Sequence, residues 1–251
     1  MRLTVVGCAG SFPSPGVPGS CYLVEAGGFA LVLDVGGGAL GELAGRVSLD
    51  AVGAVLVSHL HPDHCLDLTA WYVQRRYRPH GSVPPPPLPV WAPAGAARRL
   101  GAAYAPGGEP ADLSDQLAVV DLTAGRHQVG PVTVTAVRVA HPVETYALRV
   151  EHDGSALVYS GDTGPCPALA DLATGADLLL CEASWPDDPR NPPDLHLSGR
   201  QAGEHAAAAG VGRLVLTHLV PWYDAAGIRA EAAGAYTGPV DLARPGASWT
   251  V

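Results

Sequence analysis

The sequence predicts an α/β protein that folds as one domain. Its 251 residues are long enough for one large domain, and a hydrophobic content of 47% supplies a sizeable core. Strand-like apolar runs alternate along the chain with segments rich in Ala and Leu. The proline-rich stretch 84–89 leads directly into a strand-like run, so it predicts a stiff loop and not a linker. Residues 1–251 are therefore expected to form a single unit.

The predicted strands are short apolar runs, many of them rich in valine. They span residues 2–7, 21–25, 30–34, 52–57, 132–139, 145–151, 156–159, 177–181 and 213–217. The predicted helices have high Ala and Leu content and helical spacing of apolar residues. They span residues 39–46, 66–77, 94–104, 166–173, 199–209 and 224–235. Residues 151–154, Glu-His-Asp-Gly, carry the signal of a hairpin turn.

Four metal-competent side chains lie directly after the strand predicted at 52–57. They are His59, His61, Asp63 and His64, in the spacing His-x-His-x-Asp-His. This spacing predicts that His59 and His61 converge on one cation while Asp63 and His64 reach a second. A lone histidine would indicate little, whereas four donors within six residues favour a metal site over a structural explanation.

Three further candidate ligands follow other predicted strands. His141 comes after the run 132–139, Asp162 ends the segment 156–162, and His218 ends the segment 213–218. In isolation, Asp162 within Ser-Gly-Asp-Thr would be read as a simple turn residue. Functional groups collect in the loops at one end of the strands of layered α/β folds, so the three are expected to complete the metal site.

With these motifs the chain resembles the metallo-β-lactamase superfamily, and within it the ribonuclease Z-like branch. The resemblance begins at residues 3–10 and continues through 31–37, the histidine-rich loop and the three later ligands. It implies a four-layer αββα sandwich with metals at one edge, between two sheets. By the same resemblance, His59, His61 and His141 would bind one divalent ion, Asp63, His64 and His218 a second, and Asp162 would bridge them. Zinc is the expected metal, with manganese as the alternative in one site.

Two more residues match the ribonuclease Z-like branch, in which a histidine lies beside the scissile phosphate and a glutamate holds it. The matching residues are His196 and Glu182, so the resemblance implies catalytic roles for both, together with Asp63. The structural alternative for His196 is a position in the loop before a helix capped by Ser198. Glu182 is explained equally well as a structural residue.

The predicted function is a dinuclear metal-dependent hydrolase that acts as a phosphodiesterase on a small phosphodiester or nucleotide through metal-bound hydroxide. Two features disfavour large RNA as the substrate. Only residues 142–161 separate His141 from Asp162, which leaves no room for the tRNA-binding arm that ribonuclease Z enzymes often carry there. The net charge of −9 also lacks the basic footprint of proteins that bind polyanions. The basic run 75–78 could contact a substrate phosphate, but a solvated helix end is the preferred interpretation.

Three other functions use the same residues. An acyl hydrolase acting on a lactone, thioester or lactam would need the metals but not His196. A noncatalytic, metal-stabilised binding protein would need the ligands alone. A redox di-iron centre is disfavoured, because that use of the fold generally places a carboxylate where this chain has His61.

The composition excludes two lysine-dependent mechanisms and indicates a cellular compartment. The chain contains no lysine, which excludes a lysine Schiff base and a P-loop lysine. Five widely spaced cysteines indicate reduced thiols. No apolar stretch reaches the length of about 20 residues that spans a membrane, and the first residues lead directly into a strand. A cytoplasmic protein without membrane contact is therefore expected, and the resemblance adds a homodimer as an expectation.

Overall fold

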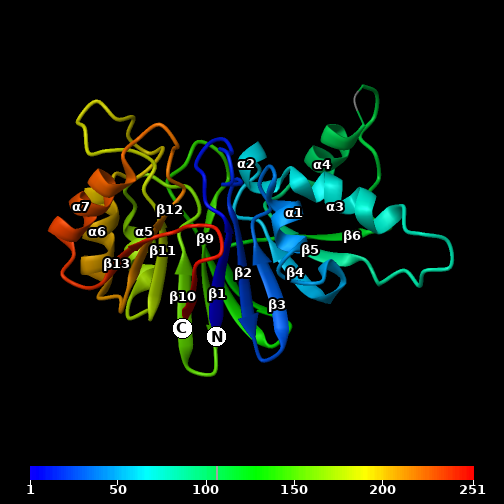
Figure 1. The fold of residues 1–251 in the computed structure, drawn as a ribbon, viewed down its shortest axis with the longest axis horizontal. Coiled ribbons are helices and arrows are strands. Elements are labelled where there is room, and N and C mark those ends of the chain that lie inside the picture. The colour runs from blue at the N-terminus through cyan, green and yellow to red at the C-terminus, as the bar shows by residue number, and fades with distance from the viewer. Residues whose placement is uncertain (106) are drawn as a thin grey trace.

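Two mixed β-sheets pack face to face in the computed structural model, which describes residues 1–105 and 107–251 (Figure 1). The strands of the first sheet follow the order β14-β1-β2-β3-β4-β5-β6, and those of the second the order β13-β12-β11-β10-β9-β8-β7. The first sheet comprises β1 (Arg2–Gly7), β2 (Cys21–Ala26), β3 (Phe29–Leu33), β4 (Val52–Leu56), β5 (Leu88–Ala92), β6 (Leu117–Asp121) and β14 (Ser248–Thr250). The second comprises β7 (Gly125–Val129), β8 (Val132–Arg138), β9 (Tyr146–His152), β10 (Ser155–Tyr159), β11 (Leu178–Glu182), β12 (Leu214–Thr217) and β13 (Val240–Leu242).

Helices cover the outer face of each sheet. On the first sheet these are α1 (Ala39–Ala44), α3 (Asp67–Arg76) and α4 (Ala96–Tyr104), and on the second α5 (Pro167–Ala173), α6 (Gly199–Ala209) and α7 (Ala225–Ala235) (Figure 1). The buried apolar residues form one cluster between the sheets and one under each helical layer. The predicted αββα sandwich is therefore confirmed.

Most predicted elements are present with ends shifted by a few residues. The helix predicted at 66–77 is present as α3, and a short helix that was not predicted, α2 (Pro62–Cys65), precedes it. Asp153 and Gly154 both have positive φ, 48° and 82°, and they turn β9 into β10 as the Asp-Gly signal predicted. In the described part of the chain, no helix is both long and apolar enough to cross a membrane.

The sequence analysis missed two strands between Cys65 and Val132. The strand-like run after the proline-rich stretch is present as β5, but this segment also contains β6 and β7. Strand β7 buries only Val129 fully, and β6 has two exposed residues at its end, because each lies at the outer edge of its sheet. An edge strand forms through pairing with its neighbour and carries little apolar periodicity of its own.

Candidate metal centre

The seven predicted ligands gather at one edge of the sandwich, where strands of both sheets end. His59 and His61 follow β4, and Asp63 and His64 lie on α2. The second sheet contributes residues that follow three of its strands, namely His141, Asp162 and His218. Their ligand atoms fall into two groups, within each of which all atoms lie within 4.8 Å of one another. These groups are His59, His61, His141 and Asp162, and Asp63, His64 and His218.

The first group brings three imidazole nitrogens together. His61 Nδ1 lies 3.0 Å from His59 Nε2 and 3.3 Å from His141 Nε2. Burial lowers the pKa of all three histidines, most strongly for the fully buried His59. Neutral rings present the lone pairs that a metal ion needs.

The second group combines two imidazoles with a carboxylate. Asp63 Oδ2 lies 3.2 Å from His218 Nε2 and 3.5 Å from His64 Nε2. Burial opposes ionisation of Asp63, but the hydrogen bond from His218 and the charge of His64 outweigh it and lower the pKa of the Asp63 carboxyl below its usual range. Asp63 is therefore an ionised ligand candidate.

Asp162 lies between the two groups. Its Oδ1 is 3.3 Å from His64 Nε2, and its Oδ2 is 3.6 Å from His59 Nε2 and 3.4 Å from His218 Nε2. One carboxylate thus faces histidines of both groups, as a bridging ligand must.

The buried polar atoms of the cluster fit a bound cation. Among the described residues, His64 Nε2 and Asp162 Oδ1 are buried without a hydrogen-bond partner, although they face each other. Burial favours the neutral form of His64, yet Asp162 and Asp34 outweigh it and raise the pKa of His64. The carboxylates here therefore favour positive charge at this nitrogen, which a divalent cation would supply.

A second set of contacts fixes the orientation of the histidine rings. In four of the five histidine ligands, the ring nitrogen that points away from the cluster has its own partner. His64 Nδ1 lies 2.7 Å from Asp34 Oδ2, His218 Nδ1 2.8 Å from Ser184 Oγ, His141 Nδ1 2.9 Å from the Leu195 carbonyl oxygen, and His59 Nδ1 3.1 Å from Ser58 Oγ. Such partners set the tautomer and direct the free nitrogen toward a metal.

Asp34 contacts a candidate ligand and was not singled out by the sequence analysis. Its buried carboxylate accepts hydrogen bonds from the Ser58 N–H at 2.7 Å, the Ser58 hydroxyl at 2.8 Å and the Tyr159 hydroxyl at 2.7 Å, besides contacting His64. Its backbone has φ of 57°, which is uncommon for aspartate. The sequence feature that could have identified Asp34 is its position, because this aspartate ends an apolar strand at the same edge as the ligands.

Two glycines allow backbone segments to approach the ligand loops closely. A Cβ at Gly36 would lie 1.9 Å from the Asp63 carbonyl oxygen, and one at Gly10 would lie 2.3 Å from that of His218. Both positions therefore exclude a side chain. Glycine is required here to bring the ends of β1 and β3 against the ligand loops.

His196 and Glu182 lie together beside the ligands. His196 Nδ1 is 3.0 Å from Glu182 Oε1 and 3.9 Å from Asp162 Oδ2. Burial disfavours the charged imidazole, but the Glu182 carboxylate outweighs it, and with Asp162 raises the pKa of His196 to about 9. Because Nδ1 is held by Glu182, Nε2 is the nitrogen free to contact a substrate.

Glu182 and the segment after His196 also have structural roles. The fully buried Glu182 accepts hydrogen bonds from the Thr163 N–H at 2.5 Å and the Ser184 hydroxyl at 2.7 Å. Ser198 caps α6 in a capping box with Gln201, as the structural alternative for this segment expected. The structural and catalytic explanations of Glu182 are therefore compatible, because one carboxylate both orders the loop and contacts His196.

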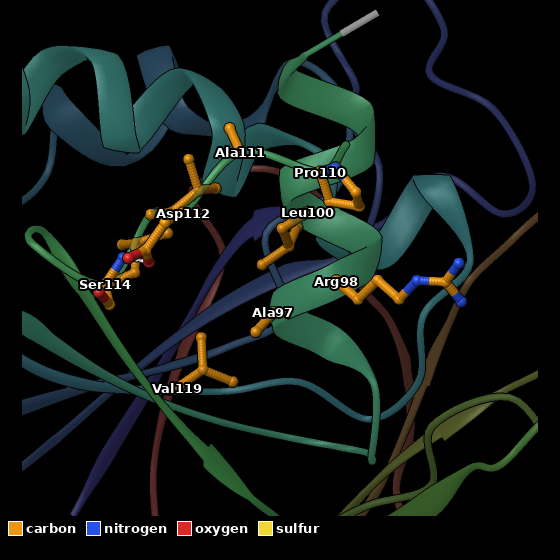
Figure 2. A pocket seen from close by; sticks show the side chains of 10 residues that line it. Ala97, Arg98, Leu100, Pro110, Ala111, Asp112, Ser114 and Val119 are labelled. Carbon is orange, nitrogen blue, oxygen red and sulfur yellow. Dashed lines mark hydrogen bonds between the residues drawn. The ribbon is translucent and has the colours of Figure 1, made fainter. Parts of the chain in front are cut away.

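Two hollows near 310 Å³ differ in their relation to this cluster. One lies between α4 and the segment 110–119, and Figure 2 shows its largely apolar lining, which includes Leu100, Ala111 and Val119. None of its lining residues is a predicted ligand. The other lies between His196 and the loop 187–194, and it is lined by Asp187, Asp188 and Asp194. Only the second hollow adjoins the candidate metal centre.

A family model, sequence relatives and a solved structure all show similarity over most of this chain. The family model of the beta-lactamase superfamily domain matches residues 33–219. An uncharacterized protein of Mycobacterium tuberculosis is 46% identical over 96% of this chain and 88% of its own length. Ribonuclease Z of Mycobacterium marinum is 36% identical, with 88% of this chain and 87% of the relative covered. The probable metallo-hydrolase YhfI of Bacillus subtilis is 30% identical over 99% of both chains, and the crystal structure of YhfI superimposes with a TM-score of 0.87, at 27% identity and 99% coverage of both.

Proposed function

This chain belongs to the metallo-β-lactamase superfamily as a ribonuclease Z-like metallohydrolase, and on that premise we propose that it is a dinuclear metal-dependent phosphodiesterase acting on small phosphodiesters or nucleotides. The observation that carries the proposal is the His196–Glu182 pair beside the ligand cluster. Acyl hydrolysis needs a polarised carbonyl and a nucleophilic water, whereas phosphodiester cleavage also benefits from a proton donor for the leaving alkoxide. A histidine held by a buried carboxylate provides that donor.

The proposed ligands are the seven donors already described. His59, His61 and His141 would hold one divalent ion and Asp63, His64 and His218 the other, with Asp162 shared and zinc as the expected metal. When bound, such ions lower the pKa of a water toward about 7 and neutralise phosphate oxygens. Four imidazoles are already oriented by hydrogen bonds on their far side, so the chain holds these donors in place before binding.

Three residues of the chain would act on protons or charge. Asp63, an ionised carboxylate, would orient the attacking water and accept its proton at a carboxylate oxygen. His196 would donate a proton from Nε2 to the leaving oxygen, and Glu182 would keep the ring oriented and cationic through Nδ1. This division of roles separates the acid and the base by environment, as general acid–base catalysis requires.

A small substrate agrees better with the net charge of the chain, −9, than a polyanion does. In the hollow next to His196, Asp187 is paired with Arg200 and Asp188 with Arg190, and Asp194 adds a further acidic side chain. The relative named ribonuclease Z acts on RNA, itself a phosphodiester. We propose that this chain applies the same bond chemistry to a shorter substrate, because acidic side chains repel an extended phosphate backbone.

The test is the initial rate of bis(p-nitrophenyl) phosphate hydrolysis by protein loaded with zinc or manganese, compared with the His196→Ala variant. The proposed proton transfer predicts a loss of roughly 100-fold or more. A matched control is His80→Ala, since His80 is exposed and distant in sequence from every proposed ligand. Metal content measured in all three proteins separates loss of catalysis from loss of metal.

Two results would contradict the proposal. If wild-type protein with both metals bound hydrolyses lactone or thioester substrates but no phosphodiester, the acyl hydrolase is favoured. Alternatively, phosphodiester turnover that is equal in wild type and His196→Ala would remove the role of His196.

A further inference from the structure

Two aromatic side chains pack together beside His218. The ring centroids of Phe12 and Trp222 lie 4.8 Å apart at an interplanar angle of 45°, and Trp222 is 70% exposed. Single exposed aromatic residues are ordinary on protein surfaces. This pair is different because it joins two loops that are far apart in sequence, and both loops contact the same predicted metal ligand.

Backbone contacts fix these loops against His218. The Ser11 backbone nitrogen lies 3.3 Å from His218 Nε2, so Phe12 follows directly after a residue in contact with that ligand nitrogen. The Gly10 N–H donates to the Leu219 carbonyl at 3.0 Å, and the Leu219 N–H donates to the Cys8 carbonyl at 3.2 Å. Consecutive Cα atoms are about 3.8 Å apart, so the backbone of Phe12 lies one residue from the Ser11 nitrogen that contacts His218.

Trp222 lies in a tight turn that follows His218. The Tyr223 N–H donates to the Val220 carbonyl at 3.1 Å, which closes a turn with Pro221 and Trp222 at its centre. In Figure 1 the dark blue loop between β1 and β2 and the orange loop after β12 lie at the same edge of the sheets as α2. The two loops that carry the aromatic pair therefore lie at the edge where the candidate ligands gather.

The charges nearby leave the organic part of a substrate to be recognised by apolar contact. The chain has no lysine, and the two arginines of the segment beside His196 are already paired, Arg190 with Asp188 and Arg200 with Asp187. The metal centre and His196 would bind the phosphate group of the substrate. The exposed ring of Trp222 is a flat surface on which a flat ring of the ligand can stack.

We propose that Phe12 and Trp222 form an aromatic subsite that stacks on the nucleobase of a nucleotide ester whose phosphate occupies the metal centre. This inference rests on the proposed phosphodiesterase function and names the class of substrate. Stacking of a base on an aromatic side chain is worth roughly 5- to 100-fold in affinity. Phe12 packs against Trp222, and Trp222 is the contact surface because it is the more exposed ring.

The experiment compares two diesters that share one leaving group. Thymidine 5′-(p-nitrophenyl phosphate) carries a base, and ethyl p-nitrophenyl phosphate does not. The wild type is expected to prefer the thymidine ester by roughly 10-fold or more in kcat/KM. Trp222→Ala should bring this ratio close to one, chiefly through KM, and Trp222→Phe should retain most of it. Tyr77→Ala is the matched control, because Tyr77 is 68% exposed and lies next to the end of α3, away from His218.

A binding measurement separates failure of the subsite from failure of the proposed function. Isothermal titration calorimetry with thymidine 5′-monophosphate reports binding without turnover and does not depend on a signal from Trp222 itself. If both esters are hydrolysed with the same ratio in wild type and Trp222→Ala, the subsite is refuted and the phosphodiesterase stands. If neither ester is hydrolysed but Trp222→Ala weakens nucleotide binding and Trp222→Phe restores it, the subsite stands and the function is refuted. Absence of both turnover and binding refutes both.

Discussion

Replacing Asp34 with alanine is expected to weaken metal binding and stability together. The Asp34 carboxylate accepts hydrogen bonds from the Ser58 N–H, the Ser58 hydroxyl and the Tyr159 hydroxyl, and it holds His64 Nδ1 at 2.7 Å. Alanine leaves the Ser58 N–H, the Tyr159 hydroxyl and the His64 ring nitrogen without this partner. A buried polar group that loses its partner costs about 1–3 kcal/mol, so partial rearrangement still leaves a loss of about 3–5 kcal/mol.

The loss of metal affinity follows from the release of His64. Removing a partner that orients a metal-binding histidine typically costs 10- to 100-fold in affinity. Asp34→Ala should therefore bind zinc about that much more weakly, and Asp34→Asn should fall between it and the wild type. The asparagine keeps the shape and an acceptor for the Ser58 N–H, but it loses the charge that favours a proton on His64 Nδ1.

Two measurements check this prediction. Urea unfolding of chelator-treated protein gives the free energy of unfolding without metal, and competition with a chromophoric chelator gives the zinc affinity. The matched control is Asp177→Ala, since Asp177 is exposed and accepts one backbone hydrogen bond, from Ala156 at 2.8 Å. Its unfolding free energy should fall by about 1 kcal/mol or less. An Asp34→Ala protein that unfolds and binds zinc like the Asp177→Ala control would refute the reasoning.

Three further predictions concern the rate, the backbone and the thiols. Asp63→Ala should lower kcat by roughly 100-fold or more with a much smaller change in KM, and near wild-type turnover would refute its role as base. Gly36→Ala should cost about 2 kcal/mol or more in urea unfolding, because its Cβ would lie 1.9 Å from the Asp63 carbonyl oxygen, and an unchanged unfolding midpoint would contradict that packing. Burial raises the pKa of Cys8 to about 12, so a thiol reagent at pH 8 should modify the half-buried Cys166 well before Cys8 in folded protein, as peptide mass mapping would show. Faster labelling of Cys8 would contradict its burial.

The seven predicted ligands could be selected from the sequence for a specific reason. Each follows a strand or begins a helix at a strand end, and the carboxyl ends of strands in layered α/β folds share one edge. The fully buried His59 and Asp162 and the half-exposed His61 were all selected in this way. Position in the chain was sufficient because a short loop keeps its side chains close to the strand end that it follows.

Asp34 and the Phe12–Trp222 pair were not singled out because their roles depend on contacts across the fold. Asp34 is 24 residues from Ser58 and 125 from Tyr159, and no local pattern encodes those hydrogen bonds. The edge strands β6 and β7 were overlooked for the same reason, since pairing with β5 and β8 defines them and their own residues show little apolar alternation.

The sequence alone determined the fold class, the order of most elements and the metal-binding residue types, because apolar periodicity and the His-x-His-x-Asp-His spacing are local properties of the chain. Only the tertiary structure decided which donors face one another, how Asp162 lies between two groups and which partners orient the histidines. The physical reason is that packing two sheets fixes distances between residues far apart in sequence. Coordination, hydrogen bonding and aromatic stacking all act over those distances of a few ångströms.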